Sequence, residues 1–289
     1  MFDHVEAYYR PGSIPEALRL FQTGNGGARF LAGGTDLINH ADRSIRSLID
    51  VTHLGLNYIR RQEGGWVIGA TTTLSDLESS TATRALAGGI LLRAASQSGP
   101  VQTRNMATVG GRVANRSQFA EIATPLVALD AVAVMAHARR RMKLPVADLF
   151  PMNGDAPTQG AMIVEIAIPA LPGGGHIGWS FQKLGRTESD VSLVNVAAGL
   201  QIGRNGNCKW ARIVVGATGP SPLRAVQAEN QLTGRTIDAT LIDIASDAVM
   251  NAVSPVSGIR GSAEYLCEMT RVMARRALLE CAKGAGCTL

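Results

Sequence analysis

Hydrophobic and polar positions predict a chain that alternates short strands and helices over its first half. Apolar alternation or short apolar runs predict strands at 2–9, 29–32, 47–52, 66–70, 131–136 and 162–168. Apolar positions at helical spacing predict helices after Ser13 and Thr73, and over 90–98 and 123–129. Ser13 and Glu16 have the spacing of a capping box, with Pro15 just inside the helix start. This mixture predicts an α+β fold.

The second half follows a cluster of structure-breaking residues, Pro169 to Gly175. We expect the main domain boundary there, which divides the chain into 1–172 and 176–289. Gly64-Gly65 predicts a hairpin and a seam that splits the first domain into subdomains of about 1–60 and 61–172. The second domain is expected to form antiparallel strands at 178–184, 193–202 and 208–215, then helices at 223–232, 241–252 and 262–282.

Composition narrows the possible functions of these domains. The 289 residues are 46% apolar and carry a net charge of +5, which fits a globular chain of two or three subdomains. The positive charge is scattered apart from Arg139–Arg141, so nucleic-acid binding is not predicted. The longest apolar candidate for a membrane span, 120–138, contains Glu121, Pro125 and Asp130. The N-terminus does not resemble a signal peptide, so a cytoplasmic protein is expected.

Metal and nucleophile motifs are missing from the sequence. The four cysteines form no Cys-x-x-Cys pair, so we expect free thiols and no iron–sulfur cluster on this chain. The five histidines form no His-Glu-x-x-His motif, so no metal site is expected. No Gly-x-Ser-x-Gly elbow occurs either.

Two glycine pairs are the candidate binding features. One lies in Leu31–Leu37 and the other in Ala107–Arg112, and each adjoins a threonine, Thr35 or Thr108. Glycine lets backbone N–H groups approach a ligand closely, and successive N–H groups can form a concave anion site. We predict that the two loops jointly hold a pyrophosphate. Neither loop has the Rossmann or Walker pattern, and a simple turn is the alternative for either loop alone.

These motifs resemble the FAD-binding subunits of the molybdenum hydroxylases, including the medium subunits of carbon monoxide dehydrogenase and the flavin domain of xanthine dehydrogenase. The resemblance rests on Ala32-Gly-Gly-Thr-Asp-Leu37 followed by Arg104-Asn-Met-Ala-Thr-Val-Gly-Gly111. It extends over nearly the whole chain, through Ile68-Gly-Ala70, Phe181-Gln-Lys183 and Gly261-Ser-Ala-Glu-Tyr265.

The resemblance implies a set of FAD-binding positions. The first phosphate loop would comprise Leu31, Ala32, Gly33, Gly34, Thr35, Asp36 and Leu37. The second would comprise Ala107, Thr108, Gly110, Gly111 and Arg112. The family usually has Asn at the position of Arg112, so the hydrogen bonding expected there differs from that of relatives. No catalytic residue is expected on this chain.

Three further positions are implied nearer the flavin ring. Glu121 occupies the place of an Asp close to the flavin or its ribityl chain in relatives, and a solvated loop Glu is the alternative. Ile163 lies on the strand that runs beside the isoalloxazine ring, and a core aliphatic is the alternative. Lys183 matches a lysine that faces the flavin, where a cation would stabilise the reduced, anionic form. An ordinary surface Lys is the alternative for this residue.

The implied fold is the vanillyl-alcohol-oxidase (PCMH) type of FAD-binding domain, with a C-terminal sheet-and-helix domain of the carbon monoxide dehydrogenase flavoprotein type. The implied function is electron transfer within a molybdenum hydroxylase. FAD on this chain would receive electrons from [2Fe-2S] clusters of a small partner subunit and pass them to NAD, oxygen or another acceptor. A large partner subunit would hold the molybdopterin cofactor, giving a heterotrimer or a dimer of heterotrimers. A stand-alone flavin reductase or oxidase and a flavin-free scaffold subunit are the alternatives.

Overall fold

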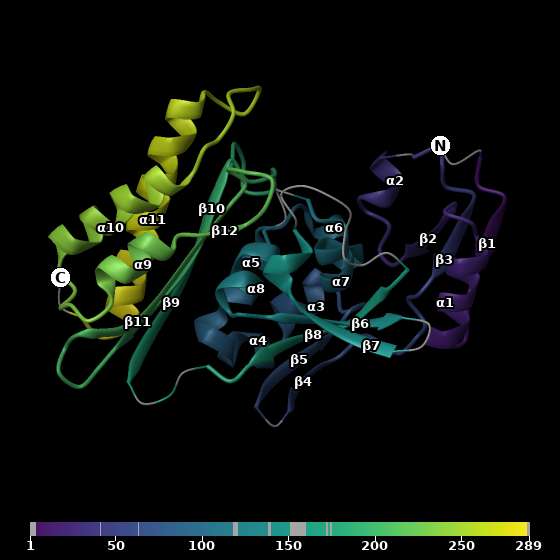
Figure 1. Cartoon of the computed structure of the whole chain (residues 1–289), viewed down its shortest axis with the longest axis horizontal. Coiled ribbons are helices and arrows are strands. Elements are labelled where there is room, and N and C mark those ends of the chain that lie inside the picture. The colour runs from purple at the N-terminus through teal and green to yellow at the C-terminus, as the bar shows by residue number, and fades with distance from the viewer. Residues whose placement is uncertain are drawn as a thin grey trace.

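The computed structural model describes residues 4–40, 42–62, 64–117, 121–137, 140–150, 160–171, 173 and 175–287. Three β-sheets follow one another along the long axis of the molecule, each built from one part of the chain (Figure 1). The predicted boundary at 169–175 lies between the second and the third sheet, and residues 172 and 174 are outside the described part.

The N-terminal lobe is a three-stranded parallel sheet with strand order β1-β3-β2. Its elements are β1 (Ala7–Tyr9), α1 (Ile14–Thr23), β2 (Ala28–Leu31), α2 (Leu37–His40) and β3 (Ser47–Asp50). Ser13 caps α1 as predicted, and its hydroxyl accepts the N–H of Glu16 at 3.3 Å. The Glu16 carboxylate accepts the N–H of Gly12 at 2.9 Å in place of the N–H of Ser13, so the reciprocal half of the predicted capping box is replaced. The first glycine segment leaves this lobe at the end of β2.

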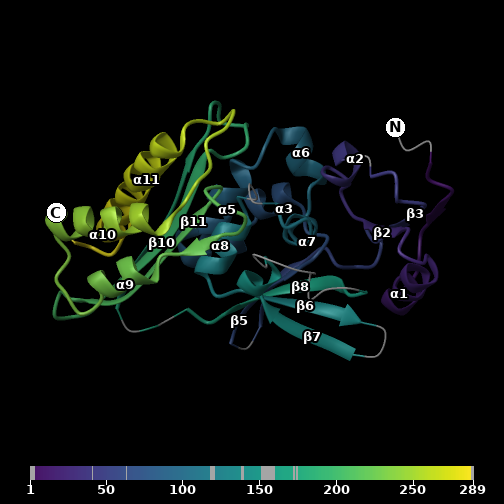
Figure 2. The ribbon, with the colours of Figure 1, turned by 45° about the horizontal axis from the view of Figure 1, so that its top comes forward.

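The middle part is a five-stranded antiparallel sheet with strand order β4-β5-β8-β6-β7. The strands are β4 (Ile59–Gln62), β5 (Gly65–Gly69), β6 (Val132–His137), β7 (Arg140–Pro145) and β8 (Met162–Pro169). Short helices connect β5 to β6 over one face of this sheet (Figure 2). They are α3 (Leu74–Ser79), α4 (Thr81–Ala85), the 3-10 turn η1 (Leu86–Gly89), α5 (Ile90–Ser96), α6 (Val101–Met106), α7 (Val109–Ala114) and α8 (Ala123–Ala128), with η2 (Val146–Leu149) following β7.

The C-terminal part is a four-stranded antiparallel sheet, β12-β11-β10-β9, with three helices. The elements are β9 (His176–Leu184), β10 (Val194–Ile202), β11 (Cys208–Gly216), β12 (Leu223–Arg224), α9 (Val226–Leu232), α10 (Ala239–Ala252) and α11 (Ala263–Gly284). The predicted helix at 223–232 is wrong at its start. Leu223 and Arg224 pair with β11 and extend the sheet before α9 begins, so sheet pairing overrides helical pattern there.

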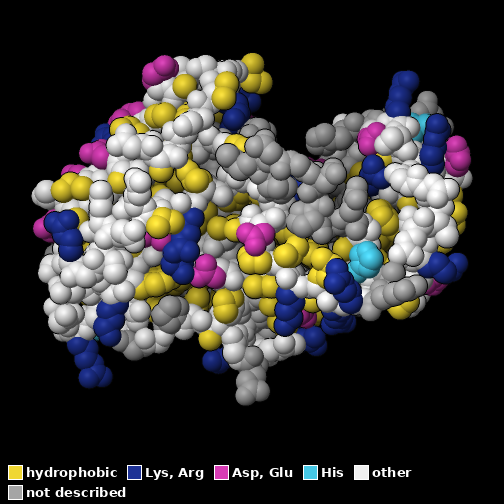
Figure 3. Space-filling model, in the orientation of Figure 1, with side chains coloured by type: hydrophobic (Ala, Val, Ile, Leu, Met, Phe, Trp, Pro, Cys, Tyr) yellow, Lys and Arg dark blue, Asp and Glu magenta, His cyan; other side chains and the backbone are white. Residues whose placement is uncertain are grey.

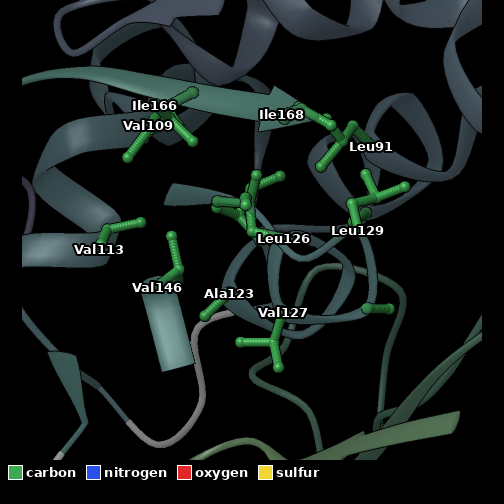
Figure 4. Packing of buried hydrophobic residues seen from close by; sticks show 14 of the residues in the cluster. Leu91, Val109, Val113, Ala123, Leu126, Val127, Leu129, Val146, Ile166 and Ile168 are labelled. Atoms are coloured by element: carbon green, nitrogen blue, oxygen red, sulfur yellow. The ribbon is translucent and has the colours of Figure 1, made fainter. Parts of the chain in front are cut away.

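Three hydrophobic cores hold these layers together. The first lies under α3, α5, α7 and α8, and it joins Ile166 and Ile168 of the middle sheet to Trp179 and Phe181 of the C-terminal sheet. Figure 4 shows its centre around Leu126 and Leu129. The second core packs the opposite face of the C-terminal sheet against α9–α11, and the third joins the N-terminal lobe to the middle sheet. The middle sheet therefore packs against both of the other parts.

Two observations concern the surface. Within the described ranges, no helix combines the length and the hydropathy needed to cross a bilayer. On the face shown in Figure 3, Lys and Arg side chains are spread over the length of the molecule among Asp and Glu. This distribution agrees with the scattered charge of the sequence.

Candidate functional site

A cavity of about 430 Å³ lies between the N-terminal lobe and the middle part. Both glycine segments line it, although one belongs to the N-terminal lobe and the other to the middle part. The predicted residues on its wall are Leu31, Ala32, Gly33, Gly34, Thr35, Asp36, Leu37, Ala107, Thr108, Gly110, Gly111, Arg112 and Ile163. The structure thus brings together residues of β2, α2, α7 and β8 that are far apart in the sequence.

The backbone of the first glycine segment forms part of this wall. Among the described residues, no acceptor is found for the N–H groups of Gly33, Gly34 and Thr35. Gly34 has φ +69°, a left-handed conformation that glycine adopts without steric cost. Three successive unpaired amides beside a left-handed residue are the kind of backbone nest that binds anions.

Gly33 also meets a packing requirement that the sequence did not predict. A Cβ built on it would lie 1.7 Å from the carbonyl oxygen of Met106. Only glycine fits there because two backbone segments touch. This contact joins the first glycine segment to the end of α6.

The second glycine segment is a helix start rather than the open loop predicted from the sequence. Thr108 caps α7, and its hydroxyl accepts the N–H of Gly111 at 3.1 Å. The neighbouring amides also have partners within the chain: Val109 donates to Thr72, Gly110 to Ala70, and Arg112 to Thr108, each at 2.9 Å. The prediction that these amides form an anion-binding nest is wrong, because Ala70, Thr72 and Thr108 already accept their hydrogens. The segment can offer the Thr108 hydroxyl proton and the Arg112 side chain.

An ion pair links the two glycine segments across the cavity wall. The Arg112 guanidinium Nη1 lies 3.2 Å from Oδ2 of Asp36, a residue 76 positions earlier. Both side chains are largely buried, with 15% and 29% of their surfaces exposed. The Nε–H of Arg112 is shielded from solvent and has no acceptor among the described residues. Arg112 therefore supplies a charge that neutralises Asp36.

Several lining residues were not predicted from the sequence. Phe21 and Phe30 stack with ring centroids 4.7 Å apart, and they join Arg29 at the N-terminal end of the cavity. Thr71 follows β5, and its hydroxyl is buried with no partner among the described residues. In the sequence, Phe21 and Phe30 have the spacing of ordinary core residues. Thr71 is one of three consecutive threonines, and nothing in that run indicates a cavity residue.

Glu121 and Lys183 are not among the residues that line this cavity. They face each other where the middle part meets the C-terminal sheet, with Nζ of Lys183 3.5 Å from Oε1 of Glu121. Their side chains are 5% and 3% exposed, so the alternatives of a solvated Glu and a surface Lys are both wrong. Glu121 accepts the N–H and hydroxyl of Ser192 at 3.1 and 2.9 Å, and Lys183 donates to the carbonyls of Gln97 and Glu188. This pair joins the middle part to the C-terminal sheet.

Ile163 extends the cavity wall from β8. It is partly exposed toward the cavity and also packs against the first hydrophobic core. Both descriptions offered by the sequence, a cavity residue and a core aliphatic, therefore apply to the same side chain. Within the described residues, no group of His, Cys, Asp or Glu is arranged to hold a metal ion.

The donor set fits a dinucleotide pyrophosphate. It combines three unpaired amides, two threonine hydroxyls at 71 and 108, and a surplus of positive charge, since the charged lining residues are Arg29, Asp36, Arg112 and Arg116. Anionic oxygens satisfy unpaired donors better than neutral groups do. Fold and cavity together indicate a protein that binds a dinucleotide cofactor between its N-terminal lobe and its middle part.

Comparisons with known proteins identify the family. The family described as FAD binding domain in molybdopterin dehydrogenase matches residues 2–171, and the CO dehydrogenase flavoprotein C-terminal domain matches 179–281. The chain therefore belongs to the FAD-binding subunits of the molybdenum hydroxylases, which are molybdopterin-dependent oxidoreductases. Its own cofactor is FAD, and the molybdopterin and iron–sulfur centres of these enzymes are on partner chains.

Individual relatives cover almost the whole chain. It is 32% identical to the 6-hydroxypseudooxynicotine dehydrogenase complex subunit alpha of Paenarthrobacter nicotinovorans, over 96% of this chain and 93% of that one. It is 28% identical to the glyceraldehyde dehydrogenase medium chain of Sulfolobus acidocaldarius, over 98% and 100%. A chain of the reconstituted CO dehydrogenase from Oligotropha carboxidovorans superposes with a TM-score of 0.92 at 28% identity, over 99% and 100%. The fold expected from the sequence is confirmed.

Proposed function

We propose that this chain is the electron-transfer subunit of a heterotrimeric molybdenum hydroxylase and that its FAD lies in the cavity between the N-terminal lobe and the middle sheet. Bound FAD would accept single electrons from iron–sulfur clusters of a small subunit and would pass them on in pairs to NAD, oxygen or another acceptor. The observation that carries the proposal is the row of three unpaired amides at Gly33, Gly34 and Thr35 on the cavity wall.

The chain's own residues would bind and orient the cofactor. The amides of 33–35 would donate to the pyrophosphate oxygens, and the hydroxyls of Thr71 and Thr108 would add further donors. Leu31, Leu37 and Ile163 form apolar parts of the wall and would exclude water from the bound molecule. We also keep Ala32, Asp36, Ala107, Gly110, Gly111 and Arg112 as cofactor-site residues by their position on the wall.

Glu121 and Lys183 act on this site indirectly in our proposal. They lie outside the cavity lining and form a buried link between the turn that precedes α8 and strand β9. Such a link fixes the C-terminal sheet against the middle part. We therefore propose that the pair sets the position of the C-terminal domain relative to the flavin site.

The division into an FAD-binding domain at 1–172, with subdomains of about 1–60 and 61–172, and a C-terminal domain at 176–289 remains our proposal. The two family matches on either side of residues 172–178 support it. The free thiols of all four cysteines support a cytoplasmic compartment. The partner chains, a large molybdopterin subunit and a small iron–sulfur subunit, are supported by relatives that are themselves subunits of such complexes.

The test is an absorption spectrum of the complex isolated natively with this chain as the tagged subunit. We expect flavin bands on a broad iron–sulfur background, together with two co-purifying chains. Flavin on a solitary chain would instead identify a stand-alone flavin reductase or oxidase. A colourless preparation with partners would identify a scaffold subunit, and either result would contradict the proposal.

A further inference from the structure

Arg112 is the last residue of the second glycine segment, and its side chain has a role that the glycines cannot have. It lies on α7, whose first amides already donate to acceptors within the chain. Its guanidinium is therefore the charged donor group that α7 adds to the cavity wall. The guanidinium is 15% exposed, and one of its nitrogens pairs with Asp36. Its Nε–H lacks an acceptor in the described structure, which is an unfavourable state for a shielded donor.

The negative charge of Asp36 explains why a positive charge at position 112 favours phosphate binding. A carboxylate on the wall of an anion site repels phosphate, and the repulsion is strong where solvent screening is weak. Arg112 neutralises that carboxylate while holding the first glycine segment against α7. The remaining N–H groups of a guanidinium suit a phosphate oxygen, because this group binds phosphate with a planar fork of donors.

We propose that Arg112 is a cofactor-affinity residue with two functions: it neutralises Asp36, and it donates a hydrogen bond to the FAD pyrophosphate. This inference rests on the proposed function of the cavity. It predicts that the affinity of this chain for FAD depends on ionic strength more steeply than it would with a neutral Asn at 112. It also predicts that the two functions can be separated by removing Asp36.

The experiment is calorimetric titration of the flavin-free full chain with FAD. Arg112→Asn, the neutral residue usual in relatives, should weaken binding by at least about tenfold, the size of a lost charge-assisted hydrogen bond. Asp36→Asn combined with Arg112→Asn should recover part of this loss, because repulsion is removed while the phosphate contact stays absent. Arg112→Lys should give an intermediate affinity, since it keeps the charge without the fork.

The matched control is Arg104→Asn. Arg104 has similar burial, with 13% of its side chain exposed, and pairs with Glu78 at 3.0 Å without lining the cavity. The FAD affinity of the Arg104→Asn variant should be within about twofold of that of the parent chain, because this variant removes the same charge from outside the site. The melting temperature of each flavin-free variant shows whether it is folded. The salt dependence of the parent chain's FAD affinity tests the charge contribution without any variant.

Five results separate the possible failures. Failure of the parent chain to bind FAD would overturn the proposed function itself. If the parent chain binds FAD, then equal binding by Arg112→Asn would overturn only the role of Arg112. Full recovery in the double variant would overturn the direct phosphate contact, and equal losses in the Arg112 and Arg104 variants would reduce the effect to net charge. An affinity of the parent chain that does not change with salt would also contradict the inference.

Discussion

The buried pair of Glu121 and Lys183 makes a strong prediction about stability. Replacing Glu121 by Gln keeps the size of the side chain and removes its charge. Lys183 would keep the carbonyl acceptors of Gln97 at 2.5 Å and Glu188 at 3.1 Å, but it would lose its counter-charge in a site where it is only 3% exposed. Breaking one side of a buried ion pair costs about 3–5 kcal/mol. We expect a loss of that size in the free energy of unfolding.

The assay is urea unfolding of the parent chain and of Glu121→Gln, followed by circular dichroism and extrapolated to water. The control is Glu268→Gln, which removes a carboxylate paired with Arg271 on the surface of α11, where Glu268 is 46% exposed. That variant should lose much less stability than Glu121→Gln, because solvent screens an exposed ion pair. A double variant with apolar residues at 121 and 183 should lose less than Glu121→Gln, because no charge is left unpaired. Equal losses for Glu121→Gln and Glu268→Gln would refute the reasoning.

Two further predictions concern packing and pH. Gly33→Ala should lower the free energy of unfolding by about 3 kcal/mol or more, because its Cβ would overlap the Met106 carbonyl; the exposed Gly12→Ala, which meets only the Glu16 carboxylate at 3.9 Å, should leave urea melting unchanged, and equal melting of both variants would contradict the contact. Burial raises the pKa of Glu280, but hydrogen bonds from Ser180 and Arg93 outweigh it and hold that pKa below the ordinary 4.5. A depressed carboxyl pKa stabilises the fold above its ordinary value and loses that effect as the pH falls through the folded pKa. Glu280→Gln should therefore melt below the parent chain at pH 7, with a difference that shrinks below about pH 4.5, and a difference independent of pH would contradict this origin.

Local sequence signals anticipated the parts of the fold that depend on local chemistry. The N-cap at Ser13 and the hairpin at Gly64-Gly65 depend on a few neighbouring residues, and both features occur where they were predicted. The second glycine segment was misinterpreted for the opposite reason. Ala70 and Thr72, which lie far away in the sequence, accept the amide hydrogens of Gly110 and Val109.

The candidate site shows the same contrast between features that local sequence predicts and features that depend on contacts between distant segments. Motif resemblance predicted thirteen residues that the structure brings to one cavity wall, from Leu31 to Ile163. It did not predict the pairing of Glu121 with Lys183, because burial at a junction of two domains leaves no trace in either local pattern. Thr71 and the stacked Phe21 and Phe30 were missed since threonine runs and apolar helix positions are common in all folds.

The central claim is that the amides of Gly33, Gly34 and Thr35 bind the cofactor. Amide hydrogen exchange measured on the flavin-free and the FAD-bound chain tests it most directly. These three amides have no acceptor in the described structure, so they should exchange fast without FAD and slowly with it. The amides of Val109, Gly110 and Gly111, which already have partners within the chain, serve as the internal control and should be protected in both forms. Unchanged exchange at residues 33–35 on saturation with FAD would contradict the account.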